Sequence, residues 1–553
     1  METPWQPEPE LQVHLDEAVP RILVTQKPNG QFGTEPWIST DQNVLLPLAV
    51  AWSRPESSHH HSDVVLDAIV RGGLALEQAQ DEAGMWVFRK KDHSEWGPIR
   101  MPWAYSRWMR AFAIVRQAMD PAARRQWEAG LQLGYTGIAA EDMARIHNIP
   151  AHHAMGLYCA GQVFERAGWC EQAADFMRQV ADVQTDHGWW AEHDGPVVAY
   201  NFVYADALGA YYAMSRDPQV LPALEGAAAY HATFTYPDGS CVETIDGRNP
   251  YHEGIRLGNP GLTRSAKGRG WTAQQHRLHL EAGQRFEADY AAAMLLYAEP
   301  GPADTPPGRR VEHTERMGDQ AMTRRRAPWF ACLSAYTVPV PPNRWGQDRQ
   351  SFVSLYHDEV GLILGGGNTK LQPLWSTFTV GDTELLAHTP GEEEPDFAPH
   401  SGLIHCPRSA RLGDDDNTPR VCLTYGELEA TVEVELADTV VVRYSVNGSG
   451  NSPGPVMAHV TLLPRMGEAL RIGESSRSLD EAPIDEALGS PTRLSHIGWW
   501  LEAPAGARLR WPVLPHNPYR KDGHAETSEG RIVLSLLLDG GQTAEIRIGV
   551  SDR

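Results

Sequence analysis

A short loop recurs along the first 300 residues, and its spacing is the feature that most constrains the fold. It appears as PNGQFGTEPW, EAGMWVF, DHGWWAEHDG and YPDGSCVETIDG, each time with a glycine beside aromatic or acidic residues. The glycines are Gly30, Gly84, Gly188 and Gly239, separated by 54, 104 and 51 residues. One unit is therefore about fifty residues long, and the longest interval holds two units. The segment GYTGIAAED, around Gly137, is expected to be the degenerate copy between them.

The segments between these loops have the periodicity of amphipathic helices. In RWMRAFAIVRQAMD, the residues Trp108, Phe112 and Val115 fall on one stripe, and EQAADFMRQVADV and EADYAAAMLLYA behave similarly. A unit of this size accommodates two helices and their connections. Helical pairs repeated at a fixed period form a solenoid or a closed toroid. The loops of all units then emerge on one face, around one cleft.

The pattern changes after residue 300. GPADTPPGRR is rich in proline and glycine and is typical of a linker. Beyond it follow short apolar or alternating runs, such as FACLSAYTV, SFVSLYH, ATVEVEL, TVVVRYSV and RIVLSLLL, without intervening helices. Such runs predict an antiparallel β-sandwich. We therefore expect an α+β multidomain protein: an (α/α) toroid of helical hairpins at 1–300 that forms the catalytic domain, a linker at 301–312 and an antiparallel β-sandwich domain at 313–553.

Composition and charge narrow the possible partners. The net charge of −23 argues against nucleic acid, because phosphate binding needs a basic surface. No apolar run is long enough for a membrane span, and METPWQPEPE lacks the pattern of a signal peptide. We therefore expect a cytoplasmic protein without a membrane partner, of open oligomeric state. The eighteen tryptophans point weakly to carbohydrate, since tryptophan stacks on sugar rings.

The six cysteines are scattered and predict free thiols. No tight metal-ligand spacing is visible, so we expect neither a metal nor another cofactor. A divalent metal held by His357 and Asp358, or by His405 beside Cys406, is the alternative. The three consecutive histidines at 59–61 form a polar segment that can bind metal adventitiously.

Three segments concentrate polar and aromatic residues. The first is HNIPAHHAMGLY, with Asn148, His152 and His153, in which Pro150 is expected to open a helix. The two histidines are adjacent and point in different directions, so at most one faces the cleft. The alternative is that one histidine is packed in the interior and the other is solvated.

The second segment is HGWWAEHDGPVVAYNFVY. Its candidate residues are Trp189, Trp190, Glu192, His193, Tyr200 and Tyr204. Tyr200 and Tyr204 are four residues apart and therefore share one face of a helix. The alternative is an aromatic stripe in the core, but the acid and the imidazole in the preceding loop favour a site.

The third segment joins YPDGSCVETIDGRNPYHEG and SAKGRGW. It offers the candidate substrate-binding residues Glu243, Arg248, Tyr251, Arg264 and Arg269. A long polar loop between helices is more often functional than idle, although a surface loop with ordinary turn residues is the alternative. Further candidates for substrate binding are Trp96, Arg100 and Arg107.

The combination of Asn, His, Tyr and Arg suits one reaction in particular. The chain shows no nucleophilic-serine motif, no P-loop and no dinucleotide fingerprint. In β-elimination next to a uronate carboxylate, amide and cationic donors neutralise the carboxylate so that the C-5 proton can be removed. A base takes that proton, and an acid protonates the leaving glycosidic oxygen. Tyrosine can do either when positive charge is near. We therefore predict a lyase acting on acidic poly- or oligosaccharides.

These residues and the two-domain layout resemble the toroid-plus-β-sandwich polysaccharide lyases, of the heparinase II/III-like, alginate and chondroitin types. The resemblance implies an Asn/His pair made by Asn148 with His152 or His153. A catalytic tyrosine then follows a loop of glycine, aromatic and glutamate, which implies Tyr200 after Glu192.

The chondroitin-lyase pattern implies a different assignment, in which Asn148, His193 and Tyr204 act together. The resemblance thus leaves open which tyrosine is catalytic. The segment DGSCVETIDGRNPYH, with Glu243 and Tyr251, also looks like the heparinase-type loop. The stretch that begins NRWGQDRQSFVSLYH resembles the start of the β-domain in such lyases.

Two other functions remain as alternatives. A toroid glycoside hydrolase needs two carboxylates across the cleft. The candidate acids for that reaction are Asp41, Glu95, Glu192, Asp194 and Glu243. The third possibility is a non-catalytic carbohydrate-binding protein on the same scaffold.

Overall fold

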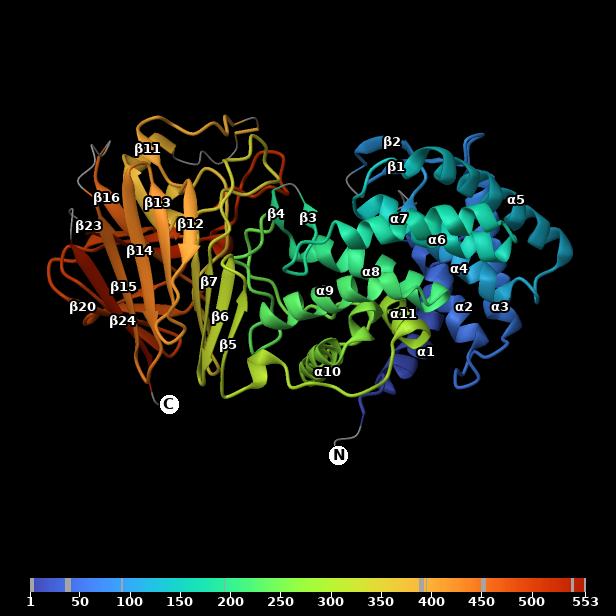
Figure 1. The fold of residues 1–553 in the computed structure, drawn as a ribbon, viewed down its shortest axis with the longest axis horizontal. Helices are drawn as coiled ribbons and strands as arrows, with labels where there is room; N and C mark the ends of the chain where they lie inside the picture. The colour runs from blue at the N-terminus through green and yellow to red at the C-terminus, as the bar shows by residue number, and fades with distance from the viewer. Residues whose placement is uncertain are drawn as a thin grey trace. The chain divides into compact units, whose positions relative to one another are not determined.

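The computed structural model describes residues 4–34, 41–90, 93–192, 194–386, 392–393, 395–448, 454–538 and 542–551. The chain forms two compact units. The first, helical unit comprises Met1–Trp190, Ala199–Ala229 and Leu257–Asp304. The second, β unit comprises Ala191–Val198, Tyr230–Arg256 and Thr305–Arg553, so two segments from within the helical half belong to it. Figure 1 shows the helices and the large sheets in separate parts of the ribbon.

Helices follow one another along the first 300 residues, as the periodicity predicts. Their bounds are α1 (Glu10–Leu23), α2 (Leu45–Ser53), α3 (Asp63–Ala79), α4 (Pro102–Val115), α5 (Pro121–Gly137), α6 (Asn148–Val163), α7 (Ala167–Asp182), α8 (Val198–Ser215), α9 (Leu221–Thr233), α10 (Ala266–Glu281) and α11 (Ala288–Tyr297). Helices α11, α2, α4 and α6 pack side by side in that order, and α3, α5 and α7 pack against them. The predicted stripe of Trp108, Phe112 and Val115 is fully buried in this core.

The repeated loop is a repeated turn. In each copy, the amide N–H of the first residue donates to the carbonyl of the residue four positions later. The N–H of the glycine donates back to the carbonyl of the first residue. The first and last residues of these turns are Lys27 and Gln31, Asp81 and Met85, Thr185 and Trp189, and Tyr236 and Ser240. All four glycines have positive φ angles, between 74° and 88°. At Gly188 a Cβ atom would lie 2.1 Å from the carbonyl oxygen of Gly226, so no other residue fits. The sequence repeat is thereby confirmed at these four positions.

The expectation that GYTGIAAED is the missing copy is wrong. Gly137 is the last residue of α5, in right-handed helical conformation with φ −66° and ψ −43°. The chain continues as a π-helical turn at Ile138–Asp142. The glycine serves a different purpose here, because a Cβ atom on it would lie 2.3 Å from the guanidinium of Arg100. Close approach of that side chain, and not a turn, explains the glycine.

The β unit contains two large antiparallel sheets, which confirms the predicted sandwich. The larger comprises β5 (Glu312–Met317), β6 (Ala321–Arg326), β7 (Trp329–Ser334), β8 (Val353–His357), β9 (Gly361–Leu364), β10 (Phe378–Gly381), β11 (Leu403–Ile404), β16 (Val456–Leu462), β19 (Ile484–Ala487), β22 (Arg508–Val513) and β23 (Arg531–Leu538). The other comprises β12 (Ser409–Leu412), β13 (Arg420–Tyr425), β14 (Leu428–Glu435), β15 (Val440–Asn447), β17 (Ala469–Ile472), β18 (Ser475–Ser478), β20 (Thr492–His496), β21 (Trp499–Ala503) and β24 (Thr543–Val550). On β14 and β15, buried residues alternate with half-buried ones, as one packed sheet face requires. Buried side chains of both sheets form a single core.

Hydrogen bonds tie the two loop segments to the rest of the β unit. The hairpin of β3 (Ala191–Glu192) and β4 (Gly195–Pro196) lies next to Asp246, whose carboxylate accepts from the amide of Val198 at 2.9 Å. Asn368 donates from its side chain to the carbonyls of Thr244 and Asp246, both at 3.3 Å. Arg349 donates to the carbonyl of Ile245 at 2.7 Å. These bonds explain why the segments belong to the sheets rather than to the helices.

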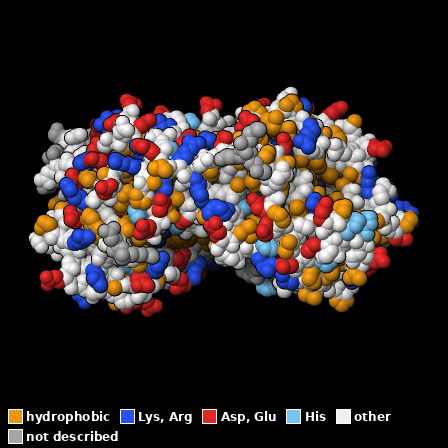
Figure 2. Space-filling view, turned by 90° about the horizontal axis from the view of Figure 1, so that it is seen from below, with side chains coloured by type: hydrophobic (Ala, Val, Ile, Leu, Met, Phe, Trp, Pro, Cys, Tyr) orange, Lys and Arg blue, Asp and Glu red, His pale blue; other side chains and the backbone are white. Residues whose placement is uncertain are grey.

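Three further observations concern the surface charges, the cysteines and the helices. Acidic and basic side chains are interspersed on the face shown in Figure 2, so the net negative charge is not gathered into one patch there. All six cysteines are free thiols, as predicted. Among the helices of the described residues, none combines the length and apolar character needed to cross a membrane.

Candidate catalytic site

Helices α6 and α8 bring two predicted residues to matching positions. The Nε2 atom of His152 donates to the main-chain carbonyl of Val203 at 3.2 Å, which joins the two helices. Asn148 lies four residues before His152 and shares its face of α6, one turn closer to the N-terminus of that helix. Tyr200 lies three residues before Val203 and shares the face of Val203 on α8, also one turn closer to the N-terminus. Both lie in the first turn, where unpaired amide N–H groups and the helix dipole favour negative charge. Pro150 also lies in the first turn of α6, as predicted.

A pocket of about 460 Å³ opens beside His152 in the helical unit. It brings together two of the predicted residues, His152 and Arg107. The remaining lining residues include Asn43, Trp103, Phe202, Val203, Asp206, Asn259, Glu287, Asp289 and Tyr290. A concave site with a few polar groups on an apolar wall is typical of small-ligand binding.

Arg107 is anchored in this pocket by Asp289. Its Nε and Nη2 atoms donate to the two carboxylate oxygens at 3.2 and 2.6 Å. Burial raises the pKa of Asp289, but the charge and hydrogen bonds of Arg107 outweigh it and hold that pKa below its ordinary value. Asp206 lines the same pocket, and there burial dominates and raises its pKa. The pocket therefore contains two carboxyl groups whose pKa values are shifted in opposite directions.

The two adjacent histidines have different surroundings, as the sequence predicts. The ring of His152 lies edge-on to Trp103, with centroids 4.4 Å apart, and 3.8 Å from a carboxylate oxygen of Asp206. Burial, together with the charges of Arg107, holds the pKa of His152 well below its ordinary value. His153 does not line the pocket, and burial lowers its pKa to about 3. Both imidazoles are therefore neutral near pH 7, and neither supplies a positive charge.

The two candidate tyrosines differ in accessibility. Tyr204 is 2 % exposed, and its ring stacks on Trp190. Trp190 is fixed in turn, because its indole N–H donates to the carbonyl of Val180 at 2.7 Å. Tyr200 is half-buried. The phenol of Tyr200, in the first turn of α8, is therefore more accessible to a ligand than the phenol of Tyr204.

The remaining candidates of the helical unit fall into exposed and anchored residues. Trp96, on the hairpin β1 (Trp86–Arg89) and β2 (Glu95–Ile99), is 65 % exposed, whereas Trp189 is buried. Arg100 is buried and pairs with Glu141 and Asp142. Arg264 and Arg269 donate to main-chain carbonyls, at 2.5 Å to Tyr297 and 2.6 Å to Pro302 respectively. These arginines hold the helical unit together, and the exposed tryptophan is accessible to a ligand.

The candidates of the β unit form their own cluster. Glu192 lies 3.8 Å from Arg248. Glu243 is buried, and its carboxylate accepts from the hydroxyl of Tyr236 at 3.0 Å and from the amide of Gly366 at 3.1 Å. Burial raises the pKa of Tyr251, so this phenol is neutral. His193, also predicted to be catalytic, lies outside the described residues.

Sequence reasoning missed several residues of the pocket, notably Trp103, Asp206, Asn259, Asp289 and Tyr290. Asp206 lies three residues after Val203, the residue whose carbonyl accepts from His152, so these two share a helical face. Asp289 gives no such signal, because an acid in the first turn of a helix is ordinary. Of the acids considered for a hydrolase, Glu95 is exposed and bonded to Arg89, and the side chain of Asp41 lies outside the described residues.

No family profile and no curated protein matches the chain. Solved structures match along almost the whole chain. Xanthan lyase from Paenibacillus is 12 % identical with a TM-score of 0.58, covering 98 % of this chain and 56 % of its own. A chondroitin AC lyase from Streptomyces coelicolor A3, solved with chondroitin sulphate, is 15 % identical with a TM-score of 0.55, covering 100 % and 81 %. Heparinase III is 13 % identical with a TM-score of 0.51, covering 98 % and 84 %.

These similarities establish the fold. The chain has the α/α toroid and antiparallel β-sandwich found in these polysaccharide lyases, as its sequence pattern predicts. It spans little more than half the length of the xanthan lyase. At 12–15 % identity the likeness does not extend to activity, which depends on the site.

Proposed function

We propose that the protein is a lyase that cleaves uronate-containing poly- or oligosaccharides by β-elimination. The observation that carries the proposal is the placement of Asn148 and Tyr200 in the first turns of two neighbouring helices, one turn from the bond between His152 and Val203. Asn148 lies one helical turn before the pocket residue His152, and Tyr200 lies three residues before the pocket residue Val203. The toroid-lyase neighbours, one of them solved with chondroitin sulphate, support the same class of substrate.

In this mechanism the amide of Asn148 and the N-terminal end of α6 donate to the uronate carboxylate. They stabilise the negative charge that develops on it when the C-5 proton leaves. Tyr200 acts as the base, and its position in the first turn of α8 favours a negative charge on the phenol oxygen. A proton returned to the glycosidic oxygen completes the elimination and leaves a double bond between C-4 and C-5.

Arg107 and His152 have supporting roles in this proposal. The guanidinium of Arg107 faces the pocket next to His152, where it can bind a polar group of a neighbouring sugar. Neutral His152 donates from Nε2 to Val203, which leaves Nδ1 as the unprotonated ring nitrogen. The histidine thus fixes the spacing between α6 and α8.

The proposal is tested by incubating the full chain with a panel of uronic-acid glycans of different sugars and linkages. A lyase produces an unsaturated uronate, which absorbs in the ultraviolet and carries one water fewer than a hydrolysis product by mass spectrometry. Saturated products alone would contradict the proposal.

A second function is favoured by the pair of carboxyl groups in the pocket. Asp206, with its raised pKa, and Asp289, with its lowered pKa, have the opposed protonation that a glycoside hydrolase needs in its acid and its base. In that case Asp206→Asn abolishes turnover and Tyr200→Phe does not. The lyase proposal instead expects that Tyr200→Phe abolishes turnover, that Asp206→Asn does not, and that the product is unsaturated.

A further inference from the structure

Two buried polar atoms at the pocket beside His152 have no hydrogen-bond partner among the described residues, namely Nδ1 of His152 and Oδ1 of Asn43. His152 is 2 % exposed. A carbonyl oxygen can only accept, so the Nε2 atom carries the proton that is donated to Val203. The ring is neutral, which leaves Nδ1 as an acceptor, and the amide oxygen of Asn43 is an acceptor as well. A ligand that donates hydrogen bonds would therefore satisfy both atoms.

Carboxyl groups outnumber cations around the same pocket. Asp206, Glu287 and Asp289 line it, whereas Arg107 is the one cation among the described lining residues. Two nitrogens of Arg107 are already bonded to Asp289. Arg110 is a further cation that acts on Asp206, but it is buried and does not line the pocket. Even with Arg110 counted, three carboxyl groups stand against two cations, so the pocket favours a ligand with positive charge.

The size and the aromatic lining of the pocket favour an organic cation over a metal ion. A volume of about 460 Å³ is within the range of pockets that bind small molecules. Trp103, Phe202 and Tyr290 line it, and aromatic faces attract cations. In the described part of the chain, the acids and the imidazole of this pocket do not bring three potential ligand atoms within 4.8 Å of one another.

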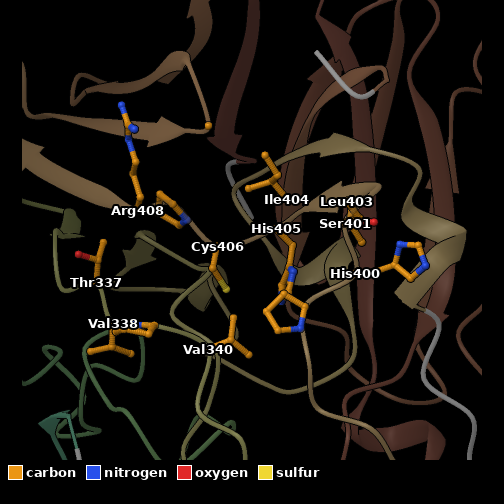
Figure 3. Close-up of a pocket in the computed structure, with 14 residues that line it drawn as sticks. Thr337, Val338, Val340, His400, Ser401, Leu403, Ile404, His405, Cys406 and Arg408 are labelled. Atoms are coloured by element: carbon orange, nitrogen blue, oxygen red, sulfur yellow. The ribbon is translucent and has the colours of Figure 1, made fainter. Parts of the chain in front are cut away.

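The pocket of the β unit offers the opposite chemistry. It has a volume of about 570 Å³, and its described lining residues include His400, His405 and Arg408 but no carboxyl group. Figure 3 shows the two imidazoles among the side chains that line it. The Nε2 atom of His405 is already bonded to the carboxylate of Asp348 at 3.0 Å. A cationic ligand is therefore expected in the helical unit and not in this second pocket.

We propose that the pocket beside His152 binds the ammonium group of an amino sugar whose nitrogen is unsubstituted. An ammonium has three N–H donors, which match the acceptors of Asp206, Asn43 and His152. An acetylated nitrogen has no positive charge to pair with the carboxyl groups, and a sulphated one is repelled by them.

This inference rests on the proposed cleavage next to a uronate, and it names the neighbouring sugar. The uronate stays at the starts of α6 and α8, where the helix dipoles favour negative charge. Asn148 lies only one helical turn from His152, so a negative and a positive group of adjoining sugars meet surroundings of the matching sign. The substrate would therefore be a glycan in which a uronate and an unsubstituted amino sugar are neighbours.

The test measures binding of probes that contain no uronate, so its outcome does not depend on turnover. The full chain is titrated at neutral pH with the methyl glycosides of glucosamine and of N-acetylglucosamine, and with spermidine. The free amine should bind at least about tenfold more tightly than the acetylated sugar. Asp206→Asn should abolish this preference. Glu171→Gln removes the charge of an exposed acid on α7 and should leave the preference unchanged, which makes it the matched control.

Glu287→Gln is the second variant, because Glu287 is exposed and its replacement leaves the interior of the protein intact. It should reduce the preference for the free amine. The proposal is overturned if the two glycosides bind equally, or if the preference survives in both pocket variants. It is also overturned if spermidine binds as tightly as the glucosamine glycoside, since the pocket would then accept any amine. If the free amine is bound as expected but no uronic-acid glycan yields an unsaturated product, the proposed lyase activity fails and the ammonium site stands.

Discussion

The ring of Tyr204 stacks on the indole of Trp190, with centroids 5.1 Å apart and planes inclined by 18°. This contact assigns Tyr204 to the packing of α8 against the loop before it. Because both rings are fully buried, the phenol of Tyr204 is shielded from a polysaccharide chain. Tyr200, one turn earlier, is half-buried and is the residue that our mechanism uses.

The first prediction separates the two tyrosines. Tyr200→Phe removes the proposed base and should lower kcat by roughly 10²–10⁴-fold, with KM nearly unchanged. Tyr204→Phe keeps the stacked ring and should lower kcat less than tenfold. Formation of the unsaturated product measures both rates, and binding of the same oligosaccharide by calorimetry is the control. Equal losses in the two variants would contradict the assignment.

The second prediction concerns the carboxylate donor. Asn148→Asp places a negative charge beside the uronate and removes the amide donor, so kcat/KM should fall by at least about 10²-fold. Asn148→Gln retains an amide on a longer side chain and should retain more activity. The same product assay checks the order. An Asn148→Asp variant as active as the parent would remove this residue from the mechanism.

The third prediction concerns the ion pair of Arg107 and Asp289. Arg107→Met deprives the carboxyl groups of Asp206 and Asp289 of their strongest counter-charge, and should lower the free energy of unfolding by about 1–3 kcal/mol. Since the pKa of Asp289 is lowered, the contribution of the pair is present above the ordinary carboxyl pKa and is lost as the pH falls below it. Urea unfolding of both single variants and the double variant measures the coupling. The double variant Arg107→Met with Asp289→Asn should recover part of the loss.

The fourth prediction concerns pH and the buried imidazole of His153. Its pKa is about 3 in the folded chain and near 6.5 when unfolded, so below pH 6.5 the unfolded state binds more protons. Stability from this group is therefore complete above pH 6.5 and declines as the pH falls towards 3, by up to about 1.4 kcal/mol per pH unit. His153→Gln should flatten the decline between pH 6.5 and 4 in denaturant unfolding. An unchanged slope would contradict the burial of a neutral ring.

The fifth prediction tests the repeated turn with two glycines. Gly188→Ala combines a left-handed φ of 80° with a clash against the carbonyl of Gly226, and should cost at least about 2 kcal/mol of unfolding free energy. Gly168 lies in α7, and a Cβ atom there meets nothing within 4 Å. Gly168→Ala should therefore be neutral or stabilise by about 0.5–1 kcal/mol. Thermal denaturation compares the two variants directly.

The sequence predicts the fold well because each element is specified locally. The turn at Gly188 needs a glycine, and the stripe from Trp108 to Val115 needs a helix, so spacing alone reveals both. The false copy at Gly137 shows the limit of this reasoning. A glycine needed for the close approach of Arg100 is indistinguishable in sequence from one needed for a turn.

The candidate site is less predictable because it is assembled from distant residues. Arg107 and Asp289 are 182 residues apart, and no local pattern indicates their ion pair. The stacking of Tyr204 on Trp190 likewise depends on tertiary packing, so the sequence leaves both tyrosines as candidates. Asn148 and Tyr200 could be proposed as site residues from the sequence, because a proline or a loop marks the start of the helix on which each of them lies.

The segment 230–256 leaves the helical half of the chain to pack with the sheets, and its acids Glu243 and Asp246 are buried there. A chain cut at the linker would deprive the carboxylate of Glu243 of the amide of Gly366, and the main-chain carbonyl of Asp246 of the side chain of Asn368. Buried acids without partners are costly, so neither half is a self-sufficient module. The linker at 301–312 is therefore not a boundary at which the chain could be divided into two independently stable parts.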